Sequence, residues 1–489
     1  MAGIAHGLRL VCMRVAIIGG GIAGLSAAYE LEQARRAGAP IEYELFEAGP
    51  RLGGVISSSV VDGTVIERGP DSFLTEKPAA AQLCRELGLE AALLPSNDAQ
   101  RKTFILVRNR LVALPDGLMF LIPTKLLATA LTPLFSWLTK IRMGLELLHP
   151  PRPHTGDESV AALVKRHYGQ QAVDRLADPL LSGIYGGDSA QLSASAVLPR
   201  LVEMETKYGS LTRGMLAGMR ARRLAAAQSD EDPAPPKPLF TTLRFGLQQM
   251  VDALTARLDA GCLHLLAPVS AVEQAGDGWR VVCGGPAQLF DAVVIATPAW
   301  AAAGMLRSTD VELSAELGAI PYSSSVTVNL VYDGADLDPL PEGFGFLVPA
   351  VEKRAMLACT FIHRKFLGRT AAGKSVIRAF LGGAHNAGLL TESDVALSSL
   401  VRRELMETLH ISAVPELVEV QRWPRAMAQY SVGHAHRQGR IKERLASLPG
   451  LQLVGNAYDG IGISDCIRLG RGAARELTAR AKIVAAPTI

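Results

Sequence analysis

The residues of this sequence whose types and spacing best suit a chemical task are three glycines near its start, in the pattern Gly19-x-Gly21-x-x-Gly24. In a dinucleotide site the first glycine permits a tight turn, the second lets the backbone approach a pyrophosphate, and the third lets a helix pack closely on a sheet. The N-terminus of that helix then faces the phosphate charge. Glu47 follows, with a carboxylate that can accept hydrogen bonds from ribose hydroxyls. These residues predict a dinucleotide-binding loop, with a glycine turn that binds no ligand as the alternative.

The elements around the glycines are those that such a loop requires. Residues 14–18 form a mainly apolar, β-branched run typical of a buried parallel strand, and residues 25–31 have helical periodicity. A second strand is predicted over residues 41–46, directly before Glu47. Together they make a complete βαβ unit, which turns a weak motif into a strong prediction. Residues 1–12 are interpreted as a leader outside the fold.

Composition argues against several other functions. Fifty basic residues against 47 acidic ones give a formal charge of +3, which is too balanced for a nucleic-acid-binding protein. The six cysteines are scattered without a Cys-x-x-Cys pair, as is typical of reduced thiols in a cytoplasmic protein. His434 and His436 lack nearby Cys or carboxylate ligands, so we expect no metal site.

At 489 residues the chain exceeds what one hydrophobic core usually supports, and two or three domains are expected.

Three further segments narrow the type of dinucleotide. Arg51-Leu52-Gly53-Gly54 places a basic residue and a glycine pair where the chain returns under the pyrophosphate, and residues 67–72 supply another turn of backbone amides. Far along the chain, residues 455–465 predict a strand end, a glycine-rich turn and a helix that Ser464 can cap. NAD domains do not need these segments, and the sequence resembles the flavin amine oxidase superfamily in having them. In that superfamily the last helix points its N-terminus at the pyrimidine edge of the flavin, where it stabilises negative charge on reduction.

Within that superfamily, the sequence resembles the oxygen-dependent porphyrinogen oxidases, which act on protoporphyrinogen IX or coproporphyrinogen III. The resemblance covers essentially the whole chain from Met13. It rests on six segments: residues 67–73, 182–188, 347–349, 380–383, 429–434 and 455–460.

The resemblance implies a non-covalent FAD and assigns residues to it. The expected contacts are Gly19, Gly20, Gly21, Ile22, Ala23, Gly24, Glu47, Arg51, Gly54, Gly69, Pro70, Asp71, Ser72, Val269, Asn456, Ile461, Gly462 and Ile463. Val269 is placed in a strand over residues 264–272, whose backbone would meet the adenine.

The same resemblance implies a large apolar cavity for the substrate. The macrocycle would lie between Leu347, Phe361 and Phe380, with the backbone near Gly183 facing the pyrrole nitrogens. An ordinary core position is the alternative for Leu347 and Phe380. Many protoporphyrinogen oxidases anchor a propionate with an arginine at the position of Thr103, so this chain departs from their pattern there. The neighbouring Arg101 and Lys102 are the candidates to replace that arginine.

The expected fold class combines α/β and α+β parts. It contains a Rossmann-like FAD domain of the GR2 flavin type, a β-rich substrate domain and a helical membrane-associating subdomain. We predict a discontinuous FAD-binding domain from residues 13–80, 240–300 and 440–489, a substrate-binding domain from 81–115 and 301–439, a helical domain from 116–220, and a flexible loop over 221–238. Further strands are predicted over residues 104–107, 111–114, 279–283, 290–296, 325–331, 345–348, 356–362, 375–381 and 451–454, and helices over 78–90 and 464–484.

The stretch from Gly117 to Leu148 is unusually apolar. Its longest uncharged run, residues 126–139, has 14 residues and contains Pro133, whereas a bilayer span needs about 20. The pattern alone leaves two alternatives, a monotopic helical segment that dips into the membrane interface and a buried helical pair. The family resemblance favours the first. We expect a cytoplasmic protein that contacts the inner face of the cell membrane peripherally.

The reaction implied by the resemblance is the six-electron oxidation of a porphyrinogen to the porphyrin in haem biosynthesis. Flavin N5 takes a hydride from a methylene bridge in each of three rounds, and the electrons pass to O2, giving H2O2, or to another acceptor. No catalytic side chain is expected, because the protein holds the ring against N5 and tunes the flavin. The alternatives are an amine oxidase or desaturase of the same superfamily and an FAD-binding scaffold without turnover. The sequence does not decide between coproporphyrinogen III and protoporphyrinogen IX, or whether the chain forms a homodimer.

Overall fold

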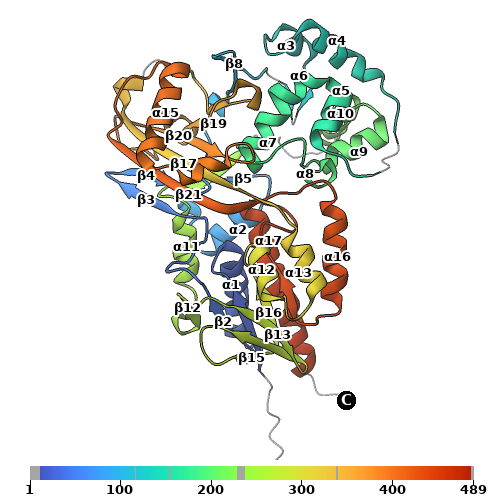
Figure 1. The fold of residues 1–489 in the computed structure, drawn as a ribbon, viewed down its shortest axis with the longest axis vertical. Helices are drawn as coiled ribbons and strands as arrows, with labels where there is room; N and C mark the ends of the chain where they lie inside the picture. Colours follow the sequence, from blue (N-terminus) through green and yellow to red (C-terminus); the bar gives the residue numbers. More distant parts are fainter. Residues whose placement is uncertain are drawn as a thin grey trace, which may run out of the picture.

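A computed structural model describes residues 12–485 of the protein apart from 116, 120, 153–155, 228–236 and 338–339. In Figure 1 a parallel sheet with its helices occupies the lower half, a large sheet lies at the upper left, and a group of helices lies at the upper right. The predicted leader falls outside the described residues except for Cys12. All six cysteines are free thiols.

The parallel sheet has five strands in the order β12–β2–β1–β16–β22. Their bounds are Leu263–His264 (β12), Ile41–Phe46 (β2), Met13–Ile18 (β1), Ala292–Ile295 (β16) and Leu451–Leu453 (β22). Side chains of the central β1 alternate between two buried clusters, Val15 and Ile17 on one face and Ala16 and Ile18 on the other. Both faces are covered, which explains the continuous apolar run and confirms the two strands predicted for the βαβ unit.

Helices from the two ends of the chain cover one face of this sheet together. They are α1 (Ile22–Arg36) and α17 (Ile463–Ala485), and the helix predicted over 464–484 is thereby confirmed. The two helices approach closely because Gly470 has no side chain: a Cβ there would lie 2.1 Å from the carbonyl oxygen of Ala23. The layer is completed by α2 (Ala79–Glu86) and α11 (Gln248–Thr255).

The other face of the parallel sheet packs on three helices and a small sheet. These elements are α12 (Ala299–Met305), α13 (Val311–Gly318), α16 (His434–Ala446), β13 (Ala271–Ala275), β14 (Gly278–Val282) and β15 (Gln288–Phe290). Two smaller sheets lie between the halves of the molecule, one of β3 (Ser58–Val61) and β4 (Thr64–Glu67), the other of β5 (Phe73–Leu74), β11 (Phe240–Leu243) and β6 (Leu93–Pro95).

The strand predicted over residues 264–272 is wrong as a single element. The chain leaves the parallel sheet after His264 and joins the small sheet at Ala271, and residues 265–270 belong to no strand. Leu266 has φ +53°, a left-handed backbone that interrupts an extended run. Val269 therefore lies in a connection between two sheets.

The large sheet has seven strands in the order β21–β17–β20–β19–β18–β7–β8. Their bounds are Leu417–Ala428 (β21), Tyr322–Asp333 (β17), Lys374–Gly382 (β20), Met356–Phe361 (β19), Gly345–Leu347 (β18), Thr103–Val107 (β7) and Arg110–Ala113 (β8). Each strand predicted in these regions is confirmed to within a few residues, while β21 was not predicted. It is an edge strand, where Pro424 is tolerated because no neighbour needs its missing N–H. Helix α15 (Asp394–Leu409) covers one face of the sheet.

The helical group packs on the β7–β18 end of the large sheet. Its helices are α3 (Leu126–Leu131), α4 (Trp137–Leu145), α5 (Val160–Tyr168), α6 (Gln170–Ala172), α7 (Asp178–Tyr185), α8 (Ala194–Val197), α9 (Pro199–Tyr208) and α10 (Leu211–Ala227). Because α10 continues to Ala227, the predicted loop is wrong for residues 221–227, and its residues 228–236 lie outside the described part of the chain.

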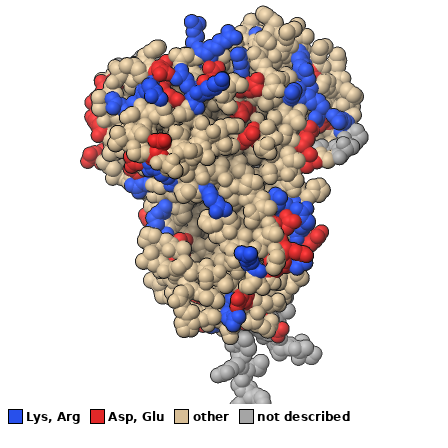
Figure 2. Space-filling view, viewed as in Figure 1, with Lys and Arg blue, Asp and Glu red and all other residues tan. Residues whose placement is uncertain are grey.

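Helices α3 and α4 lie at the outer end of this group (Figure 1). They expose apolar side chains. Leu138 is 81% exposed and Leu131 is 74% exposed. More than half of the surface of each of five neighbouring residues is also exposed, namely Leu127, Trp137, Ile141, Leu145 and Leu148. A buried helical pair is therefore the wrong alternative for this stretch. Figure 2 shows the top of the molecule covered mainly by uncharged residues, with lysines and arginines to either side. In the described part of the chain, no helix is both long and apolar enough to cross a membrane.

A buried ion network fastens α4 to the rest of the helical group. The fully buried Glu146 follows α4 and accepts hydrogen bonds from His167 Nδ1 at 2.9 Å and from the backbone N–H of Leu211 at 2.6 Å. His167 Nε2 lies 3.2 Å from Glu205, so the imidazole joins two carboxylates. Burial opposes ionisation of Glu146, but the hydrogen bonds from His167, Thr212 and Ser210 hold the pKa of its carboxyl below the usual value.

We expect Glu146→Ala to lower the free energy of unfolding by about 3–5 kcal/mol at neutral pH, because it leaves the buried His167 and the N-terminus of α10 without their acceptor. Urea denaturation measures this loss. Since the folded-state pKa of Glu146 is depressed, its contribution is present above the unfolded-state value of 4.5 and is lost as the pH falls through the folded-state pKa. Glu203→Ala, at an exposed position of α9, should change stability by less than about 0.5 kcal/mol. Equal losses in the two variants would contradict the assignment.

Candidate active site

The glycine loop lies at the carboxyl end of β1, where that strand turns into α1. Gly19 has φ +107°, and a Cβ there would lie 2.9 Å from the carbonyl oxygen of Ala296. A Cβ at Gly24 would lie 1.9 Å from Gly19 O, so the helix start touches the strand end. At Gly21 no atom would lie within 4 Å of a Cβ, and the backbone is open to a ligand. A tight turn, an open approach and a close helix–strand contact are the three features that a pyrophosphate cradle needs.

Glu47 follows β2 and reaches the loop directly. Its Oε2 accepts a hydrogen bond from Gly20 N at 2.7 Å, and its Oε1 accepts one from Gly49 N at 2.7 Å. Each carboxylate oxygen keeps a second lone pair, so ribose hydroxyls can still donate to it.

Arg51 stabilises the neighbouring turn rather than reaching across the loop. Its guanidinium donates to the carbonyl oxygens of Leu52, Gly54 and Ile56, the last at 3.0 Å. The turn is tied to the glycine loop because Gly53 N donates to Gly20 O at 2.8 Å. The two glycine-rich segments thus form one cradle of backbone groups.

The segment of residues 67–71 leads from β4 to β5, and side chains from other strands bind its carbonyl oxygens. The donors come from β17, β20, β21 and β11. They are Asn329 to Glu67 O (3.0 Å), Thr327 and Trp423 to Arg68 O (2.8 Å each), Arg378 to Gly69 O, and Thr242 to Asp71 O (2.7 Å). Every one of these bonds crosses between distant parts of the chain, so this turn is held rigidly.

The same segment anchors a buried cluster of charged side chains. Arg369 binds Glu67 at 2.5 Å, and Lys365 Nζ lies 3.0 Å from an oxygen of Asp71. Arg378 lies 4.0 Å from Asp71, and its guanidinium carbon sits 4.7 Å from the ring centroid of Phe380. Burial opposes ionisation of Asp71, but Lys365 and Arg378 hold the pKa of its carboxyl well below its usual range.

The C-terminal glycine-rich turn lies beside the start of α17. Tyr430 braces it, because its hydroxyl donates to Asn456 O at 3.0 Å and accepts from Gly460 N at 2.9 Å. The prediction that Ser464 caps α17 is wrong: the helix begins at Ile463, and the Ser464 hydroxyl donates to Lys77 O at 3.0 Å. The acceptor at the helix start is Asp465, which takes a hydrogen bond from Gly462 N at 3.2 Å. A serine near a helix start predicts a cap only when the first residue of the helix is known, and the sequence does not define that residue.

Val269 lies half-buried in the connection from β12 to β13 and packs on the cluster beneath the parallel sheet. The connection is held near the dinucleotide loop because Ala267 N donates to Glu47 O at 2.9 Å. The residue is therefore close to Glu47 in the structure although it does not belong to a strand.

The large sheet and α7 together place three of the four residues predicted to contact the substrate on one side of the sheet. Leu347 packs against the helical group, and a Cβ at Gly183 would lie 3.0 Å from Leu347 Cδ2. Phe380 is half-buried, while its strand neighbours Ala379 and Leu381 point into the core under α15. Phe361 is fully buried in that same core, on the opposite face of the sheet. The structure therefore does not bring Phe361 to the face that Leu347 and Phe380 share, and its predicted substrate contact is not supported.

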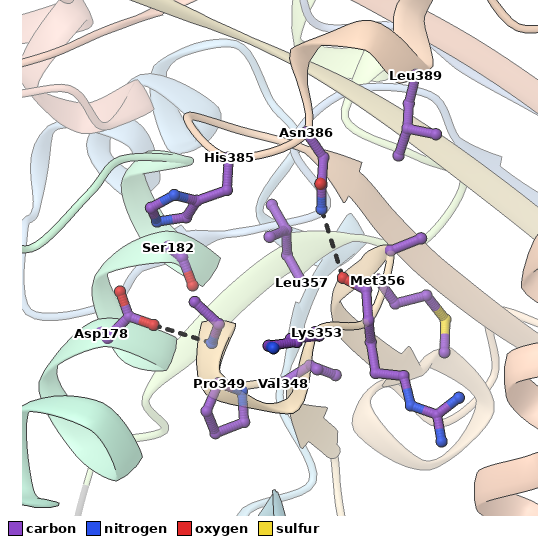
Figure 3. Close-up of a pocket in the computed structure, with 13 residues that line it drawn as sticks. Asp178, Ser182, Val348, Pro349, Lys353, Met356, Leu357, His385, Asn386 and Leu389 are labelled. Atoms are coloured by element: carbon purple, nitrogen blue, oxygen red, sulfur yellow. Dashed lines mark hydrogen bonds between the residues drawn. The ribbon is translucent and has the colours of Figure 1, made fainter.

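A pocket of about 420 Å³ adjoins this face, between α7 and the loop that joins β18 to β19 (Figure 3). Asp178 and Ser182 line it from α7, and Lys353 extends toward them from the loop. Ser182 and Val348 in its wall are the sequence neighbours of Gly183 and Leu347. Burial raises the pKa of Asp178, although the N–H of Ala350 donates to its carboxylate at 3.1 Å.

Among the described residues, two groups of side chains have ligand atoms close enough to share a metal ion, namely Glu146, His149 and His167, and Asp178, Asp188 and His385. In the first group, the carboxylate oxygens of Glu146 already accept hydrogen bonds from His167, Ser210 and Leu211. This group is explained as a structural ion network. We assign no metal role to either group.

Three residues of this region were not found from the sequence, namely Lys365, Arg369 and Arg378. Arg378 carried a usable signal, since it interrupts the apolar run Val376-Ile377-Arg378-Ala379 of a predicted strand. A charge inside a buried strand needs a buried partner, and such positions point to a site.

Comparison with known proteins gives one consistent result. Residues 22–478 match the family described as flavin-containing amine oxidoreductases. The chain is 34% identical to the coproporphyrinogen III oxidase of Bacillus subtilis, covering 94% of this chain and 96% of the relative. It is 32% identical to the coproporphyrinogen III oxidase of Staphylococcus aureus, covering 95% and 99%. A solved structure from Exiguobacterium sp. 255-15, described provisionally as a protoporphyrinogen oxidase, superposes with a TM-score of 0.83 at 32% identity, covering 96% and 99%.

Two glycine variants test the cradle. Gly21→Ala has room for its methyl group in the protein alone, so it should keep the stability of the ligand-free chain but bind the dinucleotide at least about tenfold more weakly. Gly24→Ala should instead destabilise the chain, because its methyl group collides with the backbone of Gly19. Cofactor content after purification and urea denaturation of the ligand-free proteins distinguish the two. Full cofactor content in Gly21→Ala would contradict the predicted approach.

Proposed function

The chain belongs to the family of flavin-containing amine oxidoreductases, and on this premise we propose that it oxidises a porphyrinogen to the porphyrin in haem biosynthesis. FAD is its cofactor, and the chain is an FAD-dependent oxidoreductase. The observation that carries the proposal is similarity to coproporphyrinogen III oxidases over almost the whole of both chains. Similarity of this extent includes both the dinucleotide cradle and the large sheet.

The chemistry requires a hydride acceptor, a fixed substrate and an exclusion of water. Bound FAD supplies the acceptor, and the lone pairs of the pyrrole nitrogens stabilise the cation that hydride loss leaves on the substrate. The chain supplies an apolar face that orients the macrocycle, so Leu347, Phe380 and the exposed backbone at Gly183 are its proposed contacts. No nucleophilic or acid–base side chain is needed for this reaction.

We propose that FAD spans the cradle from the glycine loop to the C-terminal turn. The residues that would hold it are those predicted from the sequence, with Glu47 at the ribose, residues 19–24 at the pyrophosphate and residues 461–463 near the flavin. The predicted division into FAD-binding, substrate-binding and helical domains is retained as a proposal. It is supported by the separate hydrophobic clusters around the parallel sheet, the large sheet and the helical group.

The carboxylates of the substrate need cations near the apolar face. Arg101 and Lys102 precede β7 and are exposed, at the end of the sheet where Thr103 pairs with Gly345. Lys353 lies beyond the other end of β18 and lines the pocket together with Val348. Coproporphyrinogen III carries four propionates and protoporphyrinogen IX carries two, so cations at both ends favour coproporphyrinogen III. We propose it as the substrate, with O2 as the acceptor that yields H2O2.

We further propose that α3 and α4 contact the surface of an anionic membrane. The exposed side chains of Leu131, Trp137 and Leu138 form an apolar surface that water solvates poorly. Lys140 lies 4.5 Å from the ring centroid of Trp137, which places a cation at the edge of that surface. Dipping to the depth of a side chain suits helices that are too short to span a bilayer.

Anaerobic addition of coproporphyrinogen III should bleach the flavin absorbance, and air should restore it with porphyrin fluorescence and H2O2. Protoporphyrinogen IX is expected to react with kcat/KM lower by about tenfold, because a missing charge pair at the protein costs on the order of 1.4 kcal/mol. Failure of both porphyrinogens to bleach a fully flavin-loaded protein would overturn the proposed function.

Two phenylalanine variants test the substrate face. Phe380→Leu should raise KM for the porphyrinogen by several-fold, whereas Phe361→Leu should leave KM unchanged and lower stability by about 1 kcal/mol. Steady-state kinetics and urea denaturation measure the two effects. A larger change of KM in Phe361→Leu than in Phe380→Leu would contradict the placement of the macrocycle.

Sedimentation with lipid vesicles tests the membrane contact. The protein should bind vesicles containing phosphatidylserine, and Leu138→Glu should reduce binding by roughly tenfold because it places a like charge in the contact. Val395→Glu on α15, where the native valine is 77% exposed, is the matched control and should bind as the unmodified protein does. Equal losses in both variants, or no binding to either neutral or anionic vesicles, would contradict the proposal.

A further inference from the structure

The buried cluster beside residues 67–72 contains more positive than negative charge. Its cations are Lys365, Arg369 and Arg378, and its carboxylates are Glu67 and Asp71. Arg369 is 0% exposed and Arg378 is 1% exposed, so solvent does not screen them effectively. Two of the three cations have a carboxylate each, Arg369 with Glu67 and Lys365 with Asp71.

Arg378 is the cation without a carboxylate of its own. Among the residues that the structure describes, its single ionic contact is Asp71 at 4.0 Å, and that carboxylate is already paired with Lys365. Its other contacts are the carbonyl oxygen of Gly69 and the face of Phe380, and its Nε has no hydrogen-bond partner. Burying a charge in this way is costly unless a further group of opposite charge comes close.

The position of Arg378 indicates what that group is. One side of Arg378 binds Gly69, which lies in the predicted FAD-binding segment, and the other side stacks on Phe380, which lies on the predicted substrate face. A hydride can pass only where the cofactor and the substrate meet, so the ring end of the FAD must lie between these two regions. Among the residues that the structure describes, the carboxylates within 4.0 Å of the cluster's cations are those of Glu67 and Asp71.

We propose that Arg378 positions the Gly69 turn for the flavin ring and keeps one uncompensated positive charge beside it, which raises the reduction potential of the flavin. This inference rests on the proposed binding of FAD at residues 69–72, and it goes beyond the choice of substrate. Two-electron reduction adds negative charge to the ring, and a buried positive charge favours that state. A flavin that is easier to reduce accepts a hydride from a carbon donor more readily.

The test is the midpoint potential of the flavin in the purified, FAD-loaded enzyme, measured by equilibration with a reference dye in the absence of any porphyrinogen. Arg378→Gln should lower the equilibrium constant for reduction about tenfold, which is about 30 mV for a two-electron couple. Asp71→Asn removes a negative charge from the same cluster and should raise the potential by a similar amount. Arg378→Lys retains the charge and should stay near the potential of the unmodified enzyme.

The opposite signs separate this role from a merely structural one, which would shift both variants in the same direction. Arg403→Gln, at an exposed position of α15, is the control and should leave the potential unchanged. If Arg378→Gln does not fold, the Asp71→Asn variant alone decides the test. A midpoint potential of that variant equal to or lower than that of the unmodified enzyme overturns the proposal. Potentials that shift as expected in an enzyme that oxidises neither porphyrinogen would refute the substrate and leave this inference standing.

Discussion

The structure depends on one constraint, that the buried and partly buried carbonyl groups of Glu67, Arg68, Gly69 and Asp71 must find hydrogen-bond donors in the protein. This segment leads from β4 to β5, and its own backbone does not supply the donors for those groups. The donors are side chains on four different strands, all remote in sequence. Because an unsatisfied buried polar group costs on the order of 1–3 kcal/mol, the two halves cannot shift against each other without losing several such bonds. The cradle and the large sheet therefore keep a fixed relative position.

In the proposed reaction, that fixed position does the work that reactive side chains do in other enzymes. A reaction in which a cofactor takes a hydride from an apolar ring needs distance and orientation above all. The backbone at Gly21 is left open by the absence of a side chain, while Leu347 and Phe380 stand on strands of a seven-stranded sheet. The glycine loop and the strands of the large sheet are both rigid. Residues 67–71, which lie between them, accept hydrogen bonds at nearly every carbonyl group. Charge then does the remaining work, through the buried cations beside Asp71.

The parts of the molecule that could be predicted from the sequence are those with local causes. The βαβ unit was predicted because β1, α1 and β2 each carry their own periodicity, and the strands of the large sheet because they are short apolar runs between turns. Val269, Ser464 and Phe361 show where such reasoning ends. Packing between distant segments sets all three features. It makes the chain change sheets at Leu266 before Val269, starts α17 one residue before Ser464, and decides toward which face of the sheet Phe361 points. The cluster around Arg378 was missed for the same reason, since its five members come from two separate regions of the chain.

The contact between Gly470 and Ala23 has a consequence for how the protein is made. Helix α1 is among the first elements to leave the ribosome, and α17, which covers it, is among the last. Until α17 emerges, the part of α1 that it covers is exposed, so the nascent chain must keep this apolar surface from aggregating for most of its synthesis. In the proposed arrangement residues 461–463, at the start of α17, lie near the flavin. The proposed cradle is therefore complete only after this part of the chain has been synthesised.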